Sequence, residues 1–208
     1  MRIAITGHRD LDEPTTALVD AAIRTLLRTH RTRDLVGVSC LAAGADLIFA
    51  RAVLELGGRL EVIVPAAGYA AALGARARRG FEELWRRAAT VESLTHPRPG
   101  PEPYRDAGLR MLDGVDHLIA VWDGGPARGR GGTAEIVEQA RRRALAVHVI
   151  WPAGARRTGR DGAADGGCGR DPARGDVTSG FAVRDSVVGD DVVRGGGSRG
   201  GGGRRGTG

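Results

Sequence analysis

Residues 2–9 read RIAITGHR, and this stretch predicts the fold class of the chain. Its apolar, partly β-branched first half predicts a buried strand, which Gly7 ends just before the polar side chains of His8 and Arg9. Pro14 suits the first turn of a helix, so a helix is expected to follow directly. A strand that passes through a short polar turn into a helix is the repeating unit of parallel α/β sheets.

The same alternation of short apolar runs and amphipathic stretches continues to about residue 151. We therefore predict an α/β domain of three layers, in which a doubly wound, mainly parallel sheet carries helices on both faces. The predicted strands are Arg2–Thr6, Leu35–Ser39, Leu60–Val64, Thr90–Ser93, His117–Val121 and Ala146–Ile150. The first predicted helix begins at Pro14, and the others cover Ala45–Leu56, Ala75–Ala89, Tyr104–Asp113 and Thr133–Arg143. The proline-rich segment 96–103 is expected to be an exposed loop.

The composition changes abruptly after Trp151. Residues 152–208 hold 18 of the 34 glycines and end in a run of glycine, arginine and serine without a periodic apolar face. Such a segment buries too little apolar surface to offset a backbone ordering cost of roughly 1–2 kcal/mol per residue. We therefore predict a folded domain over residues 1–151 and a disordered low-complexity tail over residues 152–208.

Charge, apolar runs and cysteine spacing argue against a strongly basic nucleic-acid-binding protein, a membrane protein and a disulfide-rich protein. The net charge is +6, every basic residue is arginine, and the excess is divided equally between the two regions, so neither is strongly basic. No apolar run approaches the ~20 residues that cross a bilayer, and the N-terminus lacks the pattern of a signal peptide. Cys40 and Cys168 lie too far apart in sequence to suggest a disulfide scaffold or a metal knuckle. We expect a cytoplasmic protein with no membrane partner, no metal site and no cofactor.

Candidate ligand-binding residues follow the predicted strands, because ligands of doubly wound sheets bind outside the carboxyl ends of the strands. Glycines and other small residues at these positions permit a ligand to approach the backbone closely, and the polar residues can hydrogen-bond to it. After the first, second and fifth strands the candidates are Gly7, His8, Arg9, Ser39, Ala43, Gly44, Asp46, Asp123, Gly131, Gly132 and Thr133.

The glycine-rich loop after the fifth predicted strand indicates a phosphate site. Residues 131–133, Gly-Gly-Thr, lead into a helix, so backbone N–H groups and the positive end of the helix dipole would face an anion. The loop is neither the dinucleotide fingerprint nor a Walker loop. Each candidate also has a structural interpretation: Gly-Thr is ordinary at a helix start, Arg9 suits an exposed turn and Asp46 the first turn of a helix. Tyr69 suits either base stacking or cover of the sheet edge.

Three linked motifs occur in order along the first 151 residues. They are ITGHR at 5–9, SCLAAGAD at 39–46 with AVLELGG at 52–58, and DHLIAVW at 116–122 with GGTAE at 131–135. Together they resemble the SLOG superfamily of Rossmann-like nucleotide-binding domains. The second motif is similar to the DNA-processing protein A family, and the third to the Lonely Guy phosphoribohydrolases. The resemblance implies a Rossmann-like fold with a nucleotide or nucleotide-derived ligand.

The third motif differs from that of the Lonely Guy enzymes in the position of its acid. Those enzymes carry a glutamate three positions after the threonine, where this chain has Ile136, and Glu135 stands one position earlier. One residue turns a side chain by about 100° around a helix. The enzymes also carry an Arg-Lys pair ahead of the aspartate strand, where this chain has the separate Arg105 and Arg110.

These differences favour the binding or sensing of a nucleotide or nucleotide derivative over catalysis. The first alternative is an N-glycosidase or phosphoribohydrolase acting on nucleoside monophosphates, with Glu135 as its catalytic carboxylate and arginines on the phosphate. The second alternative is the binding of single-stranded DNA, for which the sequence shows no distinct basic path. Whether the chain is an enzyme stays open at this point. Nucleic acid is the less favoured partner, and a homo-oligomer is compatible with the sequence.

Overall fold

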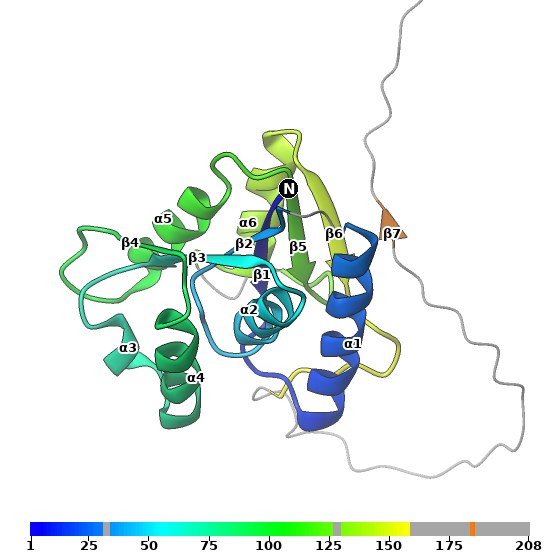
Figure 1. The fold of residues 1–208 in the computed structure, drawn as a ribbon, viewed down its shortest axis with the longest axis horizontal. Coiled ribbons are helices and arrows are strands. Elements are labelled where there is room, and N and C mark those ends of the chain that lie inside the picture. Colours follow the sequence, from blue (N-terminus) through cyan, green and yellow to red (C-terminus); the bar gives the residue numbers. More distant parts are fainter. Residues whose placement is uncertain (31–33, 127–129, 159–183, 186–208) are drawn as a thin grey trace, which may run out of the picture.

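The computed structural model describes residues 1–30, 34–126, 130–158 and 184–185 (Figure 1). Six parallel strands form one sheet in the order β4-β3-β2-β1-β5-β6, and β7, Arg184–Asp185, pairs antiparallel with β6. The parallel strands are β1 Arg2–Gly7, β2 Val36–Ser39, β3 Arg59–Val64, β4 Thr90–Ser93, β5 His117–Val121 and β6 Ala146–Ile150. The chain therefore winds from β1 to β4 on one side and then crosses back to place β5 against the other edge of β1.

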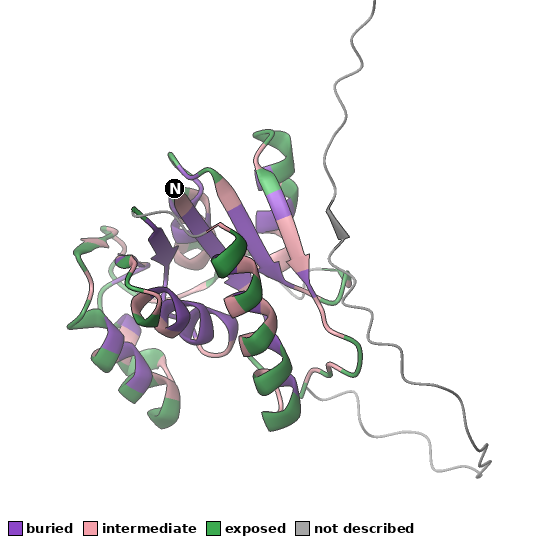
Figure 2. Ribbon diagram, turned by 45° about the vertical axis from the view of Figure 1, so that its right-hand side comes forward, coloured by how far each residue is buried: buried purple, intermediate pink, exposed green. Residues whose placement is uncertain are grey.

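Helices cover both faces of the sheet, which gives the three layers expected from the sequence (Figures 1 and 2). The helices are α1 Glu13–Thr29, α2 Ala45–Glu55, α3 Tyr69–Ala72, α4 Ala75–Trp85, α5 Pro101–Met111 and α6 Thr133–Arg142. Ile3 and Ile5 of β1 pack in a core with α1 and α2, whereas Ala4 packs in a second core with α5 and α6. This alternation follows the two-residue period of a strand, and both faces are buried because the sheet is parallel. The predicted fold class is confirmed.

Several boundaries differ from prediction, each for a physical reason. Helix α5 begins at Pro101, inside the segment expected to be a loop, because N–H groups in the first turn have no partner within the helix and proline loses nothing there. Helix α4 ends at Trp85, and the next residues lead back to the sheet, where the Ala89 N–H donates to the Leu60 carbonyl at 2.7 Å. The short helix α3 was not predicted.

The folded part of the chain continues beyond the predicted boundary at Trp151. The Arg156 N–H donates to the Thr15 hydroxyl at 2.8 Å, and the Thr158 N–H donates to the Asp10 carbonyl at 3.0 Å. These contacts hold residues 152–158 across the start of α1. The predicted disordered tail, apart from this segment and β7, lies outside the described residues. Among the residues that the structure describes, no helix is long and apolar enough to cross a membrane.

Candidate functional site

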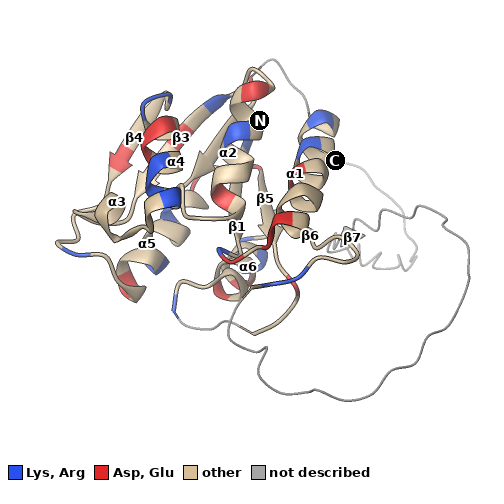
Figure 3. Cartoon of the chain, turned by 90° about the horizontal axis from the view of Figure 1, so that it is seen from below, with Lys and Arg blue, Asp and Glu red and all other residues tan. Residues whose placement is uncertain are grey.

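A cavity of about 400 Å³ opens where β1 and β5 end. These strands are neighbours, and the registers of Gly7 and Val121 coincide, so the loops that follow them begin side by side. The helices that follow them, α1 and α6, cover opposite faces of the sheet. The two loops therefore diverge at the carboxyl ends of the strands, one toward each face. This is the topological switch point, at which open α/β sheets bind their ligands. Figure 3, seen from the edge where the strands end, shows basic positions on the loops beside α6 and β6.

Close backbone packing shapes the turn after β1. A Cβ atom on Gly7 would lie 2.5 Å from Cβ of Ala45, and one on Gly44 would collide with the carbonyl oxygen of His8. Gly44 also has a φ of +75°, a conformation that residues with a side chain rarely adopt. The N–H of Ala45 donates to the His8 carbonyl at 3.3 Å. The turn after β1 is thus held against the start of α2, and Arg9, which follows it, lines the cavity.

His8 and Asp123 connect the first and fifth loops beneath the cavity. His8 is only 7% exposed, and its Nε2 lies 3.0 Å from Oδ1 of Asp123. The second carboxylate oxygen of Asp123 accepts from Nη1 of Arg157 at 3.2 Å, and the Gly125 N–H donates to Oδ1 at 2.9 Å. Partial burial alone would raise the pKa of Asp123, but these hydrogen bonds and the charge of His8 together lower it. Asp123 is therefore an ionised group that positions His8 and Arg157.

Arg9 lies on the ring of Tyr104, with its guanidinium carbon 4.8 Å from the ring centroid. Such a cation–π contact orients an exposed arginine without neutralising it. Tyr104 in turn packs edge-on against Tyr69, with ring centroids 6.0 Å apart. Tyr69 is 2% exposed and packs on Phe81, so of its two predicted roles the structure places it as cover for the sheet. Tyr104 is the more exposed of the two tyrosines that line the cavity.

Asp46 lies at the floor of the cavity and is 5% exposed. Its Oδ2 accepts from the Ser39 hydroxyl at 3.1 Å and from the Ala42 N–H at 3.3 Å. Burial raises the pKa of Asp46 to about 6, although these hydrogen bonds and the charge of Arg9 oppose the rise. Ser39 is fully buried and orients this carboxyl group.

The glycine turn before α6 completes the opposite wall. Gly131 has a φ of +74°, and a Cβ atom there would lie 2.6 Å from the backbone nitrogen of Arg105. Gly132, with a φ of −76°, is the residue before the helix, and Thr133 is the first residue within it. All three line the cavity together with Arg130. The N-terminus of a helix of ten residues and an arginine thus face the same space as Arg9.

Glu135, the predicted catalytic carboxylate, holds this turn together. Its Oε2 accepts from the Gly131 N–H at 2.7 Å, and its Oε1 accepts from Nε of Arg105 at 2.6 Å. The hydrogen bond from Gly131 lowers the pKa of Glu135 most; partial burial opposes it, and Arg105 and Arg130 lower it further. Glu135 is not among the described residues that line the cavity.

The predicted site residues therefore fall into two groups. Those that line the cavity are Gly7, His8, Arg9, Asp46, Gly131, Gly132 and Thr133. The others, which surround or support it, are Ser39, Ala43, Gly44, Asp123 and Glu135. Sequence reasoning missed Thr6, Asp10, Tyr104, Arg130 and Arg157, which also line the cavity. Thr6, Asp10 and Arg130 adjoin motifs that were recognised, whereas Tyr104 and Arg157 follow no predicted strand directly and lacked any local signal.

Comparison with solved structures shows the fold. No family model matches the chain, and no curated protein matches it by sequence. DNA processing protein A from Streptococcus pneumoniae is similar at 18% identity and a TM-score of 0.54, over 74% of this chain and 51% of that one. The same protein from Helicobacter pylori, described by its single-stranded DNA binding mode, is similar at 15% identity and a TM-score of 0.54, over 74% and 67% of the two chains.

This chain thus spans about half the length of the pneumococcal protein. The shared architecture is a Rossmann-like α/β fold, as the sequence motifs predicted. At this level of identity the likeness concerns the fold and carries no activity over.

Proposed function

We propose that the cavity binds a nucleotide or a nucleotide derivative, with its phosphate between Arg9, Arg130 and the N-terminus of α6. The observation that carries this proposal is the convergence of two arginines and a glycine turn from separate strands on one concave space. Arginine forks and helix N-terminal N–H groups both recognise phosphate oxygens. A third arginine, Arg157, also lines the space, but Asp123 already balances its charge.

The size and apolar surface of the cavity suit a ligand of this class. Its volume of about 400 Å³ lies within the range of small-molecule sites. Tyr104 stands next to Arg9, so a ligand whose phosphate reaches Arg9 brings its sugar or base close to this ring. Aromatic rings stack on nucleobases with little preference among them. The site therefore suits nucleotides with any base, and it would recognise them mainly through their phosphate.

Binding is favoured over turnover by the position of Glu135. A carboxylate that acts on a sugar must reach the reacting atoms. Both carboxylate oxygens of Glu135 instead accept hydrogen bonds, one from Arg105 and one from the Gly131 N–H, and Glu135 does not line the cavity.

The hydrolase alternative has one observation of its own in Asp46. This carboxyl group lies on the cavity floor, and its pKa of about 6 would let it exchange protons near neutral pH. Release of free base from a nucleoside monophosphate, abolished in Asp46→Asn but retained in Glu135→Gln, would establish this alternative.

Calorimetric titration with nucleoside mono-, di- and triphosphates, and with inorganic phosphate, tests the proposal. Arg9→Ala is expected to weaken nucleotide binding by about 1.5–3 kcal/mol, the range for a charged hydrogen bond. Arg59→Ala is the matched control, because Arg59 is an exposed arginine at the start of β3, at the end of the strands opposite to the cavity. Equal affinity of wild type and Arg9→Ala would refute the site. Binding of a single-stranded oligonucleotide with a steep salt dependence, without nucleotide binding, would select the DNA alternative.

A further inference from the structure

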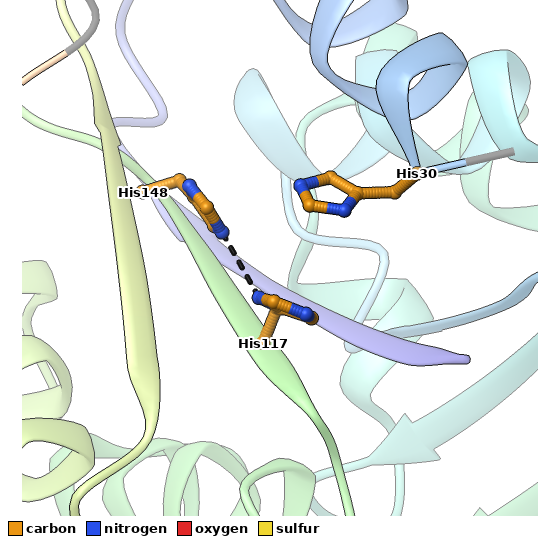
Figure 4. Close-up of side chains that lie close together, drawn as sticks. All are labelled: His30, His117 and His148. Atoms are coloured by element: carbon orange, nitrogen blue, oxygen red, sulfur yellow. Dashed lines mark hydrogen bonds between the residues drawn. The ribbon is translucent and has the colours of Figure 1, made fainter. Parts of the chain in front are cut away.

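Three of the five histidines lie close together on one face of the sheet (Figure 4). His30 directly follows α1, His117 is the first residue of β5, and His148 lies in β6. We propose that they form a binding site for a divalent transition-metal ion, with Zn²⁺ as the type ion. This site is independent of the proposed nucleotide cavity. The cavity lies past the opposite end of β5, about 13 Å away along a strand that rises about 3.3 Å per residue.

The distances between the imidazoles suit three ligands of one ion. Nδ1 of His117 lies 3.0 Å from Nε2 of His148. The His30 ring centroid lies 4.8 Å from that of His117 and 5.2 Å from that of His148. One ring nitrogen from each histidine lies within 4.8 Å of the other two. Nitrogen ligands of tetrahedral Zn²⁺ stand about 3.4 Å apart, given a bond of about 2.0–2.1 Å. Small rotations of the side chains about their χ angles would bring the three nitrogen–nitrogen separations to this value.

The sheet register explains why two of the ligands face each other. His117 pairs with Ala146, and Ile119 pairs with His148, so the two histidines stand one pleat apart on adjacent strands. Side chains two residues apart on a strand share a face, so His117 lies on the same face as Ile119, which packs in the core beneath α1. The end of α1 then delivers His30 to the same face. Two ligands therefore stand on hydrogen-bonded strands, and the third closes on them from the helix layer.

The chemistry of the donors selects the class of ion. Among the residues that the structure describes, the cluster consists of three imidazoles, a donor set that suits Zn²⁺, Co²⁺ or Ni²⁺ and not Mg²⁺ or Ca²⁺, which prefer oxygen. Three protein ligands leave a fourth position for water. A bound ion would replace the His117–His148 hydrogen bond and cross-link α1, β5 and β6.

Zinc titration of the full chain without an affinity tag tests this site, after removal of metal with a chelator and dialysis. We expect about one equivalent of Zn²⁺ per chain, measured by calorimetry and by competition with a chromogenic chelator. His30→Gln and His148→Gln are each expected to lower the affinity at least tenfold, since even removing a group that only orients a ligand costs about 10–100-fold. His96→Gln is the matched control, because His96 is a partly exposed histidine that pairs with Asp106 outside the cluster.

Two further measurements keep the outcome interpretable. Far-ultraviolet circular dichroism of the metal-free variants shows that they fold, and His30→Gln is the safer variant because its residue lies at a helix end. Co²⁺ is expected to give visible bands of a nitrogen-ligated site in wild type and in Arg9→Ala. Equal Zn²⁺ affinity in wild type, His30→Gln and His148→Gln would overturn the proposal, as would the absence of binding. Thiolate charge-transfer bands with Co²⁺ would overturn it too, since they would assign the ion to cysteine.

Discussion

Asp46→Asn should stabilise this protein at alkaline pH and remove part of the pH dependence of its stability. The carboxyl group is buried and keeps a pKa of about 6, whereas an exposed aspartate has a value near 3.8. Between these two values the folded chain binds more protons than the unfolded chain. The free energy of unfolding must therefore fall as the pH rises from about 4 through 6.

The size of the effect follows from the same two values. One pKa unit corresponds to about 1.4 kcal/mol, so a rise from 3.8 to about 6 makes ionised Asp46 destabilising by about 3 kcal/mol above pH 7. Asparagine keeps a carbonyl oxygen that can accept from the Ser39 hydroxyl and the Ala42 N–H, so the local hydrogen bonds survive. The variant loses the attraction between the Asp46 carboxylate and Arg9. We expect a gain of about 1–3 kcal/mol at pH 8 and a difference near zero at pH 3.5.

Urea unfolding at pH 3.5, 5, 6.5 and 8 measures this difference directly. For a domain of this size, 1 kcal/mol corresponds to a shift in Tm of about 2–4 °C, so the gain at pH 8 should also be visible in a thermal melt. Asp34→Asn is the control, because Asp34 is exposed and its exchange should leave the pH profile unchanged. If Asp46→Asn were no more stable than wild type at pH 8, or kept the full pH dependence, the assignment of a raised pKa to Asp46 would be refuted.

Three further predictions concern the turn before α6 and the end of the folded chain. Gly131→Ala should lower the free energy of unfolding by about 1–3 kcal/mol in urea unfolding, because of its positive φ and the contact with Arg105; Gly132→Ala, at negative φ, is the control. Glu135→Gln should cost about 1–3 kcal/mol in the same assay, since the pKa of Glu135 is lowered by partners that prefer its charge, and this loss should diminish as the pH falls below the ordinary glutamate value of 4.5; an equal loss at neutral and at strongly acidic pH would contradict it. A chain ending after Thr158, which among the described elements loses only the two-residue strand β7, should keep nearly the same Tm and the same nucleotide affinity in calorimetry; one ending after Trp151 should bind more weakly because it also lacks Arg157, which lines the cavity and balances the charge of Asp123.

The order and nature of the elements could be predicted from local sequence. The bounds of β4, β5 and β6 agree with prediction; β5 and β6 are mainly apolar, and β5 is followed by polar and glycine residues that end it. Gly7 and Arg9 could be placed beside the cavity for a related reason: in a parallel sheet, the residues at and directly after the ends of the strands all lie at the same edge.

Tertiary structure decided which of those residues meet and what each one does. Glu135 was the catalytic carboxylate of the hydrolase alternative; in the structure α5 brings Arg105 to it, and Glu135 binds Arg105 and the Gly131 N–H within the turn. Arg157 entered the cavity only because the chain beyond β6 crosses back over the start of α1. His30, His117 and His148 are dispersed in sequence and came together through strand register and the packing of α1. Local sequence sets the backbone conformation and the period of burial, whereas contacts between distant residues depend on strand order and helix packing, which the chain as a whole determines.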